Sequence, residues 1–331
     1  IGVIFPRGVD DVIAVMRYCA DAQVAVLPRG GGTSLAGQAV NEAVVLDFTK
    51  HMAAVGPVDS DQQLVRAEAG VTLGRLNAHV APTGLKFPPD PAWGDKSTLG
   101  GAIGNNSTGA HSLLYGKTDY YLEEVEAVLA DGSTATFGEM TIEQLREQAD
   151  PEGSLLEQIH ARVLGVLEEH AATIESRYPD LKRNVSGYNL DMLVDAMRGQ
   201  MRLPDDSGVD PDQTPGSVNL AHLLAGSEGT LAIITAATVR LEPKPAAKGV
   251  LLLTYDEILD AMADVAPILE HGPAAVEVMD DILLALARDS PEFGPVVELL
   301  PEGTNSVLLV EFYGETTAAI EAQIDALAAD R

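Results

Sequence analysis

Apolar and polar residues along the first 140 positions form short stretches of two kinds. Short, mainly apolar stretches predict strands at residues 3–5, 24–27 and 43–48, and a further strand is predicted at residues 64–70. Between them, residues 9–22 and 72–82 repeat apolar side chains at helical spacing. Residues 122–138 predict a hairpin, because Asp131-Gly132 suits the positive φ of a tight turn. The N-terminal part of the chain is therefore predicted to alternate strands and helices.

The pattern becomes helical between about residues 141 and 218. Ser154 and Glu157 have the spacing of a capping box, and the apolar positions after them predict a long amphipathic helix. A polar loop at 202–217 then leads back to a strand-like run at 230–243. Because strand patterns flank this helical block on both sides, we interpret it as an insertion into an α+β domain.

A Pro-rich run at 243–248 separates this part from a second region in which strands and helices alternate. We therefore predict a first domain at residues 1–243, with its helical insertion at about 141–218, and a second domain at 244–331. The chain starts without Met on a predicted strand and ends within a helical pattern. We expect it to be part of a longer polypeptide, with the second domain truncated.

The charge balance excludes two classes of partner. The chain has 21 Lys and Arg against 50 Asp and Glu, which gives a formal net charge of −29. Nucleic acids and anionic membrane surfaces select basic faces, so we expect no nucleic-acid partner. No apolar stretch reaches the length of a membrane-spanning helix, and we expect no integral membrane span. Cys19 is the single cysteine, which excludes a disulfide framework and fits a reducing, cytoplasmic compartment.

A glycine-rich loop, PRGGGTSLAGQ at residues 28–38, follows the predicted strand at 24–27. It is not a nucleotide-triphosphate P-loop, because Gln38 and Ala39 stand where Lys and Ser or Thr would be required. It is not a dinucleotide-binding GxGxxG loop either, because Leu35 occupies the third glycine position. The loop instead offers a run of successive backbone N–H groups, and its backbone can curl so that these groups surround an oxyanion.

Two more segments of this kind occur later in the chain. Residues 87–112 read FPPDPAWGDKSTLGGAIGNNSTGAHS, and residues 226–235 read GSEGTLAIIT. The first loop alone is explained equally well as a flexible turn, but the second segment holds too many small polar groups for a plain connection. Three of them together favour an elongated cofactor that is contacted along its length.

In this order the three segments resemble the FAD-binding domain of the PCMH-type superfamily, which contains vanillyl-alcohol oxidase and p-cresol methylhydroxylase. Within it the chain is most similar to FAD-linked D-2-hydroxyacid dehydrogenases, a group with D-lactate, glycolate and D-2-hydroxyglutarate dehydrogenases. The insertion, with KRNVSGYNLDML at 182–193, is similar to long bacterial members whose flavin half continues into an iron–sulfur half. The resemblance implies an α+β fold: a PCMH-type FAD-binding domain of two α/β subdomains, followed by part of a ferredoxin-like cap domain.

The resemblance also implies which residues contact FAD, mostly through backbone groups or short hydroxyls. They are Arg29, Gly30, Gly31, Gly32, Thr33, Ser34 and Gln38 in the first segment, Pro89, Asp90, Ser97, Thr98, Gly101, Asn106 and Gly109 in the second, and Glu228, Gly229 and Ile233 in the third. Members with covalent flavin often carry His in the first loop, where this chain has Thr33. We therefore expect the FAD to be bound non-covalently.

The reaction implied is oxidation of a D-2-hydroxy acid to the 2-oxo acid, with a hydride passed to the flavin and the hydroxyl proton taken by a base. Electrons then go to a downstream acceptor or iron–sulfur domain, whose cluster we expect only outside this chain. We expect a cytoplasmic protein that is either free in solution or held at the membrane periphery by its electron acceptor. No metal ligands are expected within the chain.

The catalytic base is not assigned by the sequence. The substrate-binding residues of relatives lie beyond Arg331, and within the chain His111 and Asn189 are the candidates. Two other functions stay open: a non-redox use of the FAD fold, such as alkyl transfer, and a non-catalytic subunit that carries FAD and relays electrons.

Overall fold

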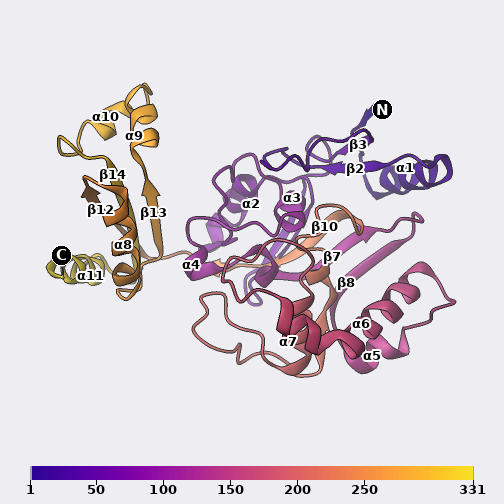
Figure 1. The fold of residues 1–331 in the computed structure, drawn as a ribbon. Helices are drawn as coiled ribbons and strands as arrows, with labels where there is room; N and C mark the ends of the chain where they lie inside the picture. Colours follow the sequence, from indigo (N-terminus) through magenta and orange to yellow (C-terminus); the bar gives the residue numbers. More distant parts are fainter. Residues whose placement is uncertain (1, 331) are drawn as a thin grey trace. The chain divides into compact units, whose positions relative to one another are not determined.

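The computed structural model describes residues 2–330 and consists of two compact units (Figure 1). Unit 1 contains the chain up to Gly109 and Tyr115–Pro243, and unit 2 contains Ala110–Leu114 together with the chain from Lys244 onward. The short segment Ala110–Leu114 thus leaves unit 1, packs in unit 2 and returns. The sequence did not predict that this segment packs with unit 2.

A small parallel sheet begins unit 1, with strands β1 (Gly2–Ile4), β3 (Val44–Asp47) and β2 (Val26–Arg29) in that order. Helix α1 (Val9–Ala22) connects β1 to β2 and confirms the helix predicted at about these residues. It has two acidic residues in its first turn and ends at Gln23 in the left-handed region. This βαβ arrangement places the first glycine-rich segment directly after β2.

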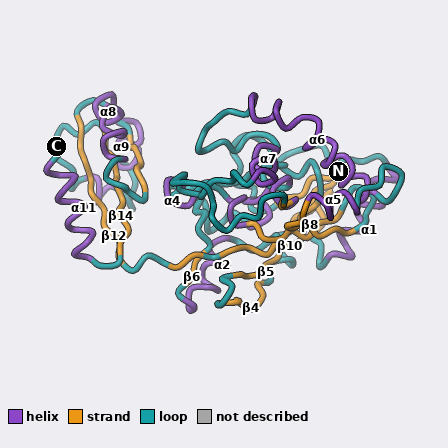
Figure 2. The backbone as a smooth tube through the Cα atoms, turned by 90° about the horizontal axis from the view of Figure 1, so that it is seen from below, coloured by secondary structure: helices purple, strands orange, loops and turns teal. Residues whose placement is uncertain are grey.

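The main sheet of unit 1 has six strands in the order β4-β5-β10-β7-β8-β9, and Figure 2 shows several of them side by side. Its strands are β4 (Val55–Asp59), β5 (Leu64–Glu68), β10 (Ile233–Arg240), β7 (Leu122–Val128), β8 (Thr134–Thr141) and β9 (Ser217–Asn219). The predicted hairpin is confirmed as β7–β8, with Gly132 at φ +78° in its turn. Strand β10 is central and almost wholly buried, so the segment before it is held in a fixed place.

Short elements surround this sheet. They are α2 (Leu73–Val80), α3 (Leu99–Gly104), the 3₁₀ turns η1 (Ala81–Thr83), η2 (Thr118–Tyr121) and η3 (Leu220–Leu223), and the strand pair β6 (Leu85–Lys86) and β11 (Glu242–Pro243). Helix α4 (Ser112–Tyr115) begins within the segment that belongs to unit 2. Helix α3 lies within the second glycine-rich segment, and the Thr98 hydroxyl caps its first turn by accepting from the Gly101 amide.

Three helices, α5 (Ile142–Glu147), α6 (Leu155–Arg177) and α7 (Leu190–Arg198), lie between β8 and β9. The capping box predicted for the long helix is confirmed: Ser154 Oγ accepts from the Glu157 amide, and the Glu157 carboxylate accepts from the Ser154 amide. Because β9 pairs with β8, the chain leaves the sheet and returns to it around this helical block.

Unit 2 is a three-stranded antiparallel sheet in the order β12-β14-β13 with helices on it. Its elements are β12 (Ala247–Tyr255), α8 (Ile258–Leu269), β13 (Ala275–Met279), α9 (Asp281–Arg288), α10 (Gly294–Val297), β14 (Ser306–Gly314) and α11 (Thr317–Ala329). Helices α8 and α11 cover one face, where Phe312, Ile320 and Leu327 are fully buried or nearly so. The alternation of β14 therefore places Glu311 and Tyr313 on the opposite face.

The capping box of α6 yields a stability test. Replacing Ser154 with Ala leaves the Glu157 amide without its acceptor, and we expect a loss of about 1 kcal/mol in the free energy of unfolding, measured by denaturant titration. Ser176 in the same helix caps nothing, and Ser176→Ala should not lower stability. Equal stability of the two variants would contradict the role given to the cap.

Candidate functional site

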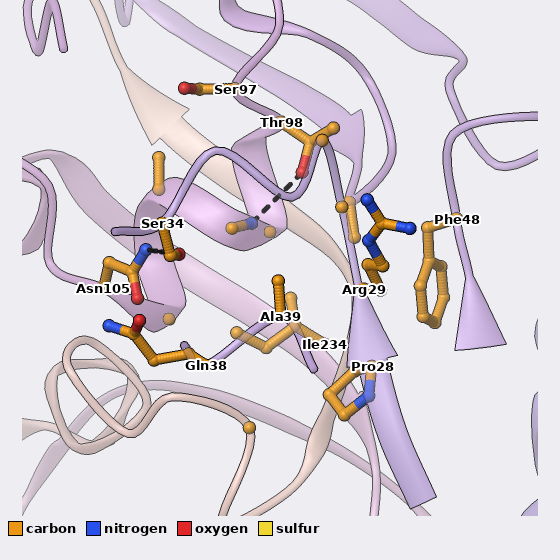
Figure 3. A pocket seen from close by; sticks show the side chains of 18 of the residues that line it. Pro28, Arg29, Ser34, Gln38, Ala39, Phe48, Ser97, Thr98, Asn105 and Ile234 are labelled. Carbon is orange, nitrogen blue, oxygen red and sulfur yellow. Dashed lines mark hydrogen bonds between the residues drawn. The ribbon is translucent and has the colours of Figure 1, made fainter. Parts of the chain in front are cut away.

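A cleft of about 820 Å³, counting the space at its open mouth, lies in unit 1 where the three glycine-rich segments meet (Figure 3). The first segment follows β2, the second contains α3, and the third leads into β10. Phe48 and Ala69, at the ends of β3 and β5, complete the lining. The segments are far apart in sequence, and the tertiary fold of unit 1 brings them together.

The first and second segments pack so closely that no side chain fits between them. A Cβ atom on Gly31 would overlap the carbonyl oxygen of Lys96, and one on Gly30 would overlap the Thr98 hydroxyl. A substitution at either glycine must push the two segments apart. The glycines are thus required by the packing of the protein itself, in addition to the approach to a ligand that the sequence suggested.

Side chains of the first loop bond across to the second segment. The Thr33 and Ser97 hydroxyls lie 3.0 Å apart, and the Asn105 amide donates to Ser34 Oγ at 2.8 Å (Figure 3). The third segment closes against the first through Gly229, at φ +75°, which lies against the Pro28 ring. The hydroxyls that the sequence suggested for a ligand are therefore also used to hold the cleft together.

The backbone of the first loop has unused donors. The amide N–H groups of Gly30–Ser34 donate no hydrogen bond to any residue within 2–330. Gly32 adopts φ +67°, the left-handed conformation that lets successive amides turn toward one point. These residues are exposed or half-buried, so their amides are accessible from the cleft, and such a run of N–H groups suits an anionic ligand.

Two polar side-chain atoms in the same cleft also lack partners. Arg29 Nε and Gln38 Oε1 are buried, and neither has a hydrogen-bond partner among the described residues. The Arg29 guanidinium makes no ion pair with them either, although the protein carries a net charge of −29. Figure 3 draws its side chain beside the ring of Phe48. A ligand with phosphate oxygens satisfies both the amides and this cation.

The structure brings most of the sequence-predicted cofactor residues into the cleft. The lining includes Arg29, Gly30, Gly31, Gly32, Thr33, Ser34, Gln38, Ser97, Thr98, Gly101, Glu228 and Gly229. Pro89, Asp90, Asn106, Gly109 and Ile233 do not line it. Asp90 and Gly109 instead pack on each other, with no room for a Cβ atom at Gly109. Pro89, which precedes Asp90 in the sequence, is buried.

Several lining residues were missed by sequence reasoning. Ala232 and Ile234 line the cleft, whereas Ile233 between them is buried on the other side of β10. The period of two in the strand could have identified them. Asn105, Ser107 and Phe48 were also missed, and only the tertiary packing reveals them.

Asn106 and Asn189 belong to a buried polar network around Asp119, whose side chain is wholly buried. Asp119 Oδ2 accepts from Asn106 Nδ2 at 2.6 Å, from Asn189 Nδ2 at 2.9 Å and from Lys117 Nζ at 3.0 Å. Asn189 precedes α7, so the network joins the helical insertion to the second glycine-rich segment. The structure thus gives Asn189 a tertiary contact in this network and does not place it in the cleft lining.

His111, the other catalytic candidate, lies in unit 2 with Ala110–Leu114. Its Nε2 atom is 2.9 Å from Glu311 Oε2 and 2.6 Å from the Tyr313 hydroxyl. It is therefore part of a cluster on the sheet of that unit.

Residues 2–330 lack two further kinds of feature. No described helix combines the length and apolarity needed to span a bilayer. No group of three or more His, Cys, Asp or Glu side chains within that range is arranged to hold a metal ion.

Comparisons with known proteins agree with the geometry. Residues 1–138 match the family described as FAD binding domain, and residues 244–330 match the family described as FAD linked oxidases, C-terminal domain. A D-2-hydroxyglutarate dehydrogenase of Pantoea ananatis is 32% identical over 99% of this chain and 31% of its own length. A D-lactate dehydrogenase of Archaeoglobus fulgidus is 31% identical over 84% of this chain and 47% of its own.

Glycolate oxidase subunit GlcD of Bacillus subtilis is 29% identical over 93% of this chain and 50% of its own length. The chain thus spans about a third to a half of these relatives. Among solved structures, an alkyldihydroxyacetonephosphate synthase superposes with a TM-score of 0.63 at 16% identity, over 99% of this chain and 49% of that one. This likeness concerns the fold alone.

The buried His222 in η3 predicts a pH dependence of stability. Burial lowers the pKa of its imidazole to about 4, and the nearby Asp119 carboxylate only partly opposes this. The unfolded chain, with a pKa near 6.5, binds the proton first, so stability is complete above about pH 6.5 and falls as the pH drops toward 4. At pH 5 we expect wild type to have lost about 2 kcal/mol more than His222→Gln, relative to pH 7.

The measurement is denaturant unfolding of both proteins at pH 7 and pH 5, with the exposed His51→Gln as the control that should behave as wild type does. The same pH dependence in wild type and His222→Gln would show that His222 does not contribute it.

Proposed function

We propose that this chain is the flavin-carrying part of an enzyme that oxidises a D-2-hydroxy acid to the 2-oxo acid. Residues 1–138 match the FAD binding domain family, and residues 244–330 match the family of C-terminal domains of FAD linked oxidases. The relatives named above act, by their names, on 2-hydroxyglutarate, lactate or glycolate. We propose a substrate from this group and a downstream electron acceptor or iron–sulfur domain as partner.

The observation that carries the proposal is the set of unused donors in the cleft. FAD has a diphosphate in the middle of an elongated molecule, and the free amides of Gly30–Ser34 with the Arg29 guanidinium supply neutral and cationic partners for it. The rest of the cleft, with short hydroxyls and glycines of the second and third segments, suits the ribityl and adenosine parts. Thr33, bonded to Ser97, offers no tether, so the FAD is held non-covalently.

When bound there, FAD supplies the acceptor for the hydride that leaves C2 of the acid. The residues of this chain hold its phosphates and exclude water from the cleft. They also hold the first and second glycine-rich segments against each other. Gln38 Nε2 donates to Glu228 Oε1 at 3.4 Å. The side-chain oxygen Oε1 of Gln38 has no partner among the described residues and accepts from a donor of the ligand.

The role of Arg29 is testable by cofactor binding alone. Arg29→Met removes the cation while keeping the length of the side chain, and we expect the Kd for FAD to rise at least about tenfold. Riboflavin has no phosphate, so its Kd should be unchanged. Flavin fluorescence quenching on the apoprotein measures both. Arg7→Met, which removes an exposed Arg paired with Asp11, is the matched control. Equal losses for FAD and riboflavin would exclude a contact between Arg29 and the diphosphate.

The proposed reaction is tested by mixing the full-length, FAD-loaded protein anaerobically with D-lactate, D-2-hydroxyglutarate and glycolate, and with L-lactate and L-2-hydroxyglutarate as controls. We expect one D-acid or glycolate to bleach the flavin absorbance within seconds and the L-acids to be far slower. A flavin that stays oxidised with every acid would overturn the proposal and favour a non-redox use of the fold.

A further inference from the structure

Helix α3 ends in a turn whose central residue, Asn106, has an unusual backbone conformation. The amides of Asn106 and Ser107 donate to the carbonyl oxygens of Ile103 and Ala102, both at 2.9 Å, which closes the helix in a Schellman motif. Asn106 adopts φ +45°, in the left-handed region, and its side chain is wholly buried. Glycine is the common residue at this place because it adopts such a φ without strain. An asparagine there needs support from its surroundings.

The conformation of Asn106 matters to the cleft because the residues on both sides of it, Asn105 and Ser107, belong to the cleft lining. The left-handed φ sets the direction in which the backbone leaves the turn, and so the direction of both neighbouring side chains. The Asn105 amide also donates to Ser34 Oγ at 2.8 Å, which fastens the first loop (Figure 3). A different conformation at Asn106 would therefore displace two cleft residues and one bond to the first loop.

Asp119 holds the Asn106 side chain by both ends of its amide group. Asp119 Oδ2 accepts from Asn106 Nδ2 at 2.6 Å, and the Asp119 N–H group donates to Asn106 Oδ1 at 3.0 Å. Two bonds in opposite directions fix the orientation of the amide as well as its position. Rotation of the Asn106 backbone out of the left-handed region would break both of them.

The Asp119 carboxylate has further donors, and its charge is neutralised. Asn189 Nδ2 and Lys117 Nζ also donate to Oδ2, at 2.9 and 3.0 Å, and the Tyr120 N–H group donates to Oδ1 at 2.9 Å. A carboxylate accepts all of these, whereas a neutral amide would turn an NH₂ group toward other donors. The Lys117 side chain is only 12% exposed, so the ion pair is largely shielded from water. Asp119 thus acts on the cleft through geometry and not through charge.

The helical insertion reaches the same turn from another side. Asn189 belongs to it, and Lys117 Nζ donates to the carbonyl oxygen of Asn184, also in the insertion, at 3.1 Å. Gly226 of the third glycine-rich segment lies between the turn and the insertion: a Cβ atom there would come within 2.9 Å of the Gly187 carbonyl oxygen. The insertion and the second and third glycine-rich segments therefore meet around Asn106.

We propose that Asp119 is a positioning residue for the FAD site: it keeps Asn106 in the left-handed conformation and thereby holds the two neighbouring residues in the cleft. Asp119 itself lies outside the cleft lining. Through its bond from Asn189, the helical insertion also supports the cofactor, although none of residues 142–216 lines the cleft. This inference rests on the FAD site of the proposed function and adds the network that shapes it.

The test measures the Kd for FAD by flavin fluorescence quenching on the full-length apoprotein. Asn106→Ala and Asn106→Gly remove the same side-chain hydrogen bonds, but only glycine adopts φ +45° freely. We expect the Kd to rise at least about tenfold for Asn106→Ala, and Asn106→Gly to bind FAD at least about fivefold more tightly than Asn106→Ala. Asp119→Asn, which keeps the size of the side chain, should raise the Kd at least about tenfold.

A double variant shows whether Asp119 acts through Asn106. In the Asn106→Gly background the turn no longer depends on the carboxylate, so adding Asp119→Asn should change the Kd by less than about threefold. A change as large as in wild type would overturn the inference. The two Asn106 variants decide the claim by themselves if Asp119→Asn does not fold.

Asn77→Ala is the matched control. Asn77 makes the same kind of paired bonds at the start of the second glycine-rich segment: it donates to the Phe87 carbonyl oxygen at 3.3 Å and accepts from the Phe87 amide at 2.7 Å. Neither residue lines the cleft, so its Kd for FAD should equal that of wild type. Melting temperatures are measured for every variant, so that a loss of stability is not read as a loss of positioning.

The outcomes separate the two claims. If Asn106→Ala and Asp119→Asn bind FAD as tightly as wild type, the network stabilises the fold only, and this inference fails while the proposed function stands. Equal weakening by Asn106→Ala and Asn106→Gly also overturns it, because the conformation of the turn would then not matter. If the wild-type apoprotein does not bind FAD, the proposed function fails and this inference fails with it.

Discussion

The structure of unit 1 depends on the close contact between the loop after β2 and the turn before α3. Gly30 and Gly31 lie so near Lys96 and Thr98 that even a methyl group cannot be placed between them. This contact sets the position of the loop, and its cross-bonds from Thr33 and Ser34 follow from it. The cleft exists because two stretches of backbone, far apart in sequence, touch without side chains between them.

The electrostatics of the cleft are a second consequence of this arrangement. A protein with a net charge of −29 disfavours a dianion anywhere near its surface. The free amides of Gly30–Ser34 hold such a ligand through neutral dipoles, and Arg29 adds one cation that no carboxylate within residues 2–330 neutralises. The acidic network around Asp119 is separate, because that carboxylate is already satisfied by Lys117 and two amide side chains.

Local patterns predicted most of the elements and part of the site. Helix α1, the β7–β8 hairpin and the capping box of α6 depend on neighbouring residues, and each was predicted from the sequence. The hydrogen-bond partner of Asn106 and Asn189 was not predicted, because only the tertiary fold brings the buried Asp119 between them. The packing of Ala110–Leu114 in unit 2, which brings His111 to Tyr313, is likewise invisible in any local pattern. The period of two along β10 could have indicated that Ile233 lies on the other side of the strand from the cleft.

The central claim is that FAD lies in the cleft formed by the three glycine-rich segments. Amide hydrogen exchange, compared between the apoprotein and the FAD-loaded protein, tests it most directly, because the method reports each backbone N–H group. The account predicts that FAD slows exchange at residues 30–34, at 97–101 and at 228–229, with the largest effect in the first loop, whose amides have no partner inside the protein. FAD-dependent protection elsewhere, with the amides of residues 30–34 still exchanging freely, would contradict it.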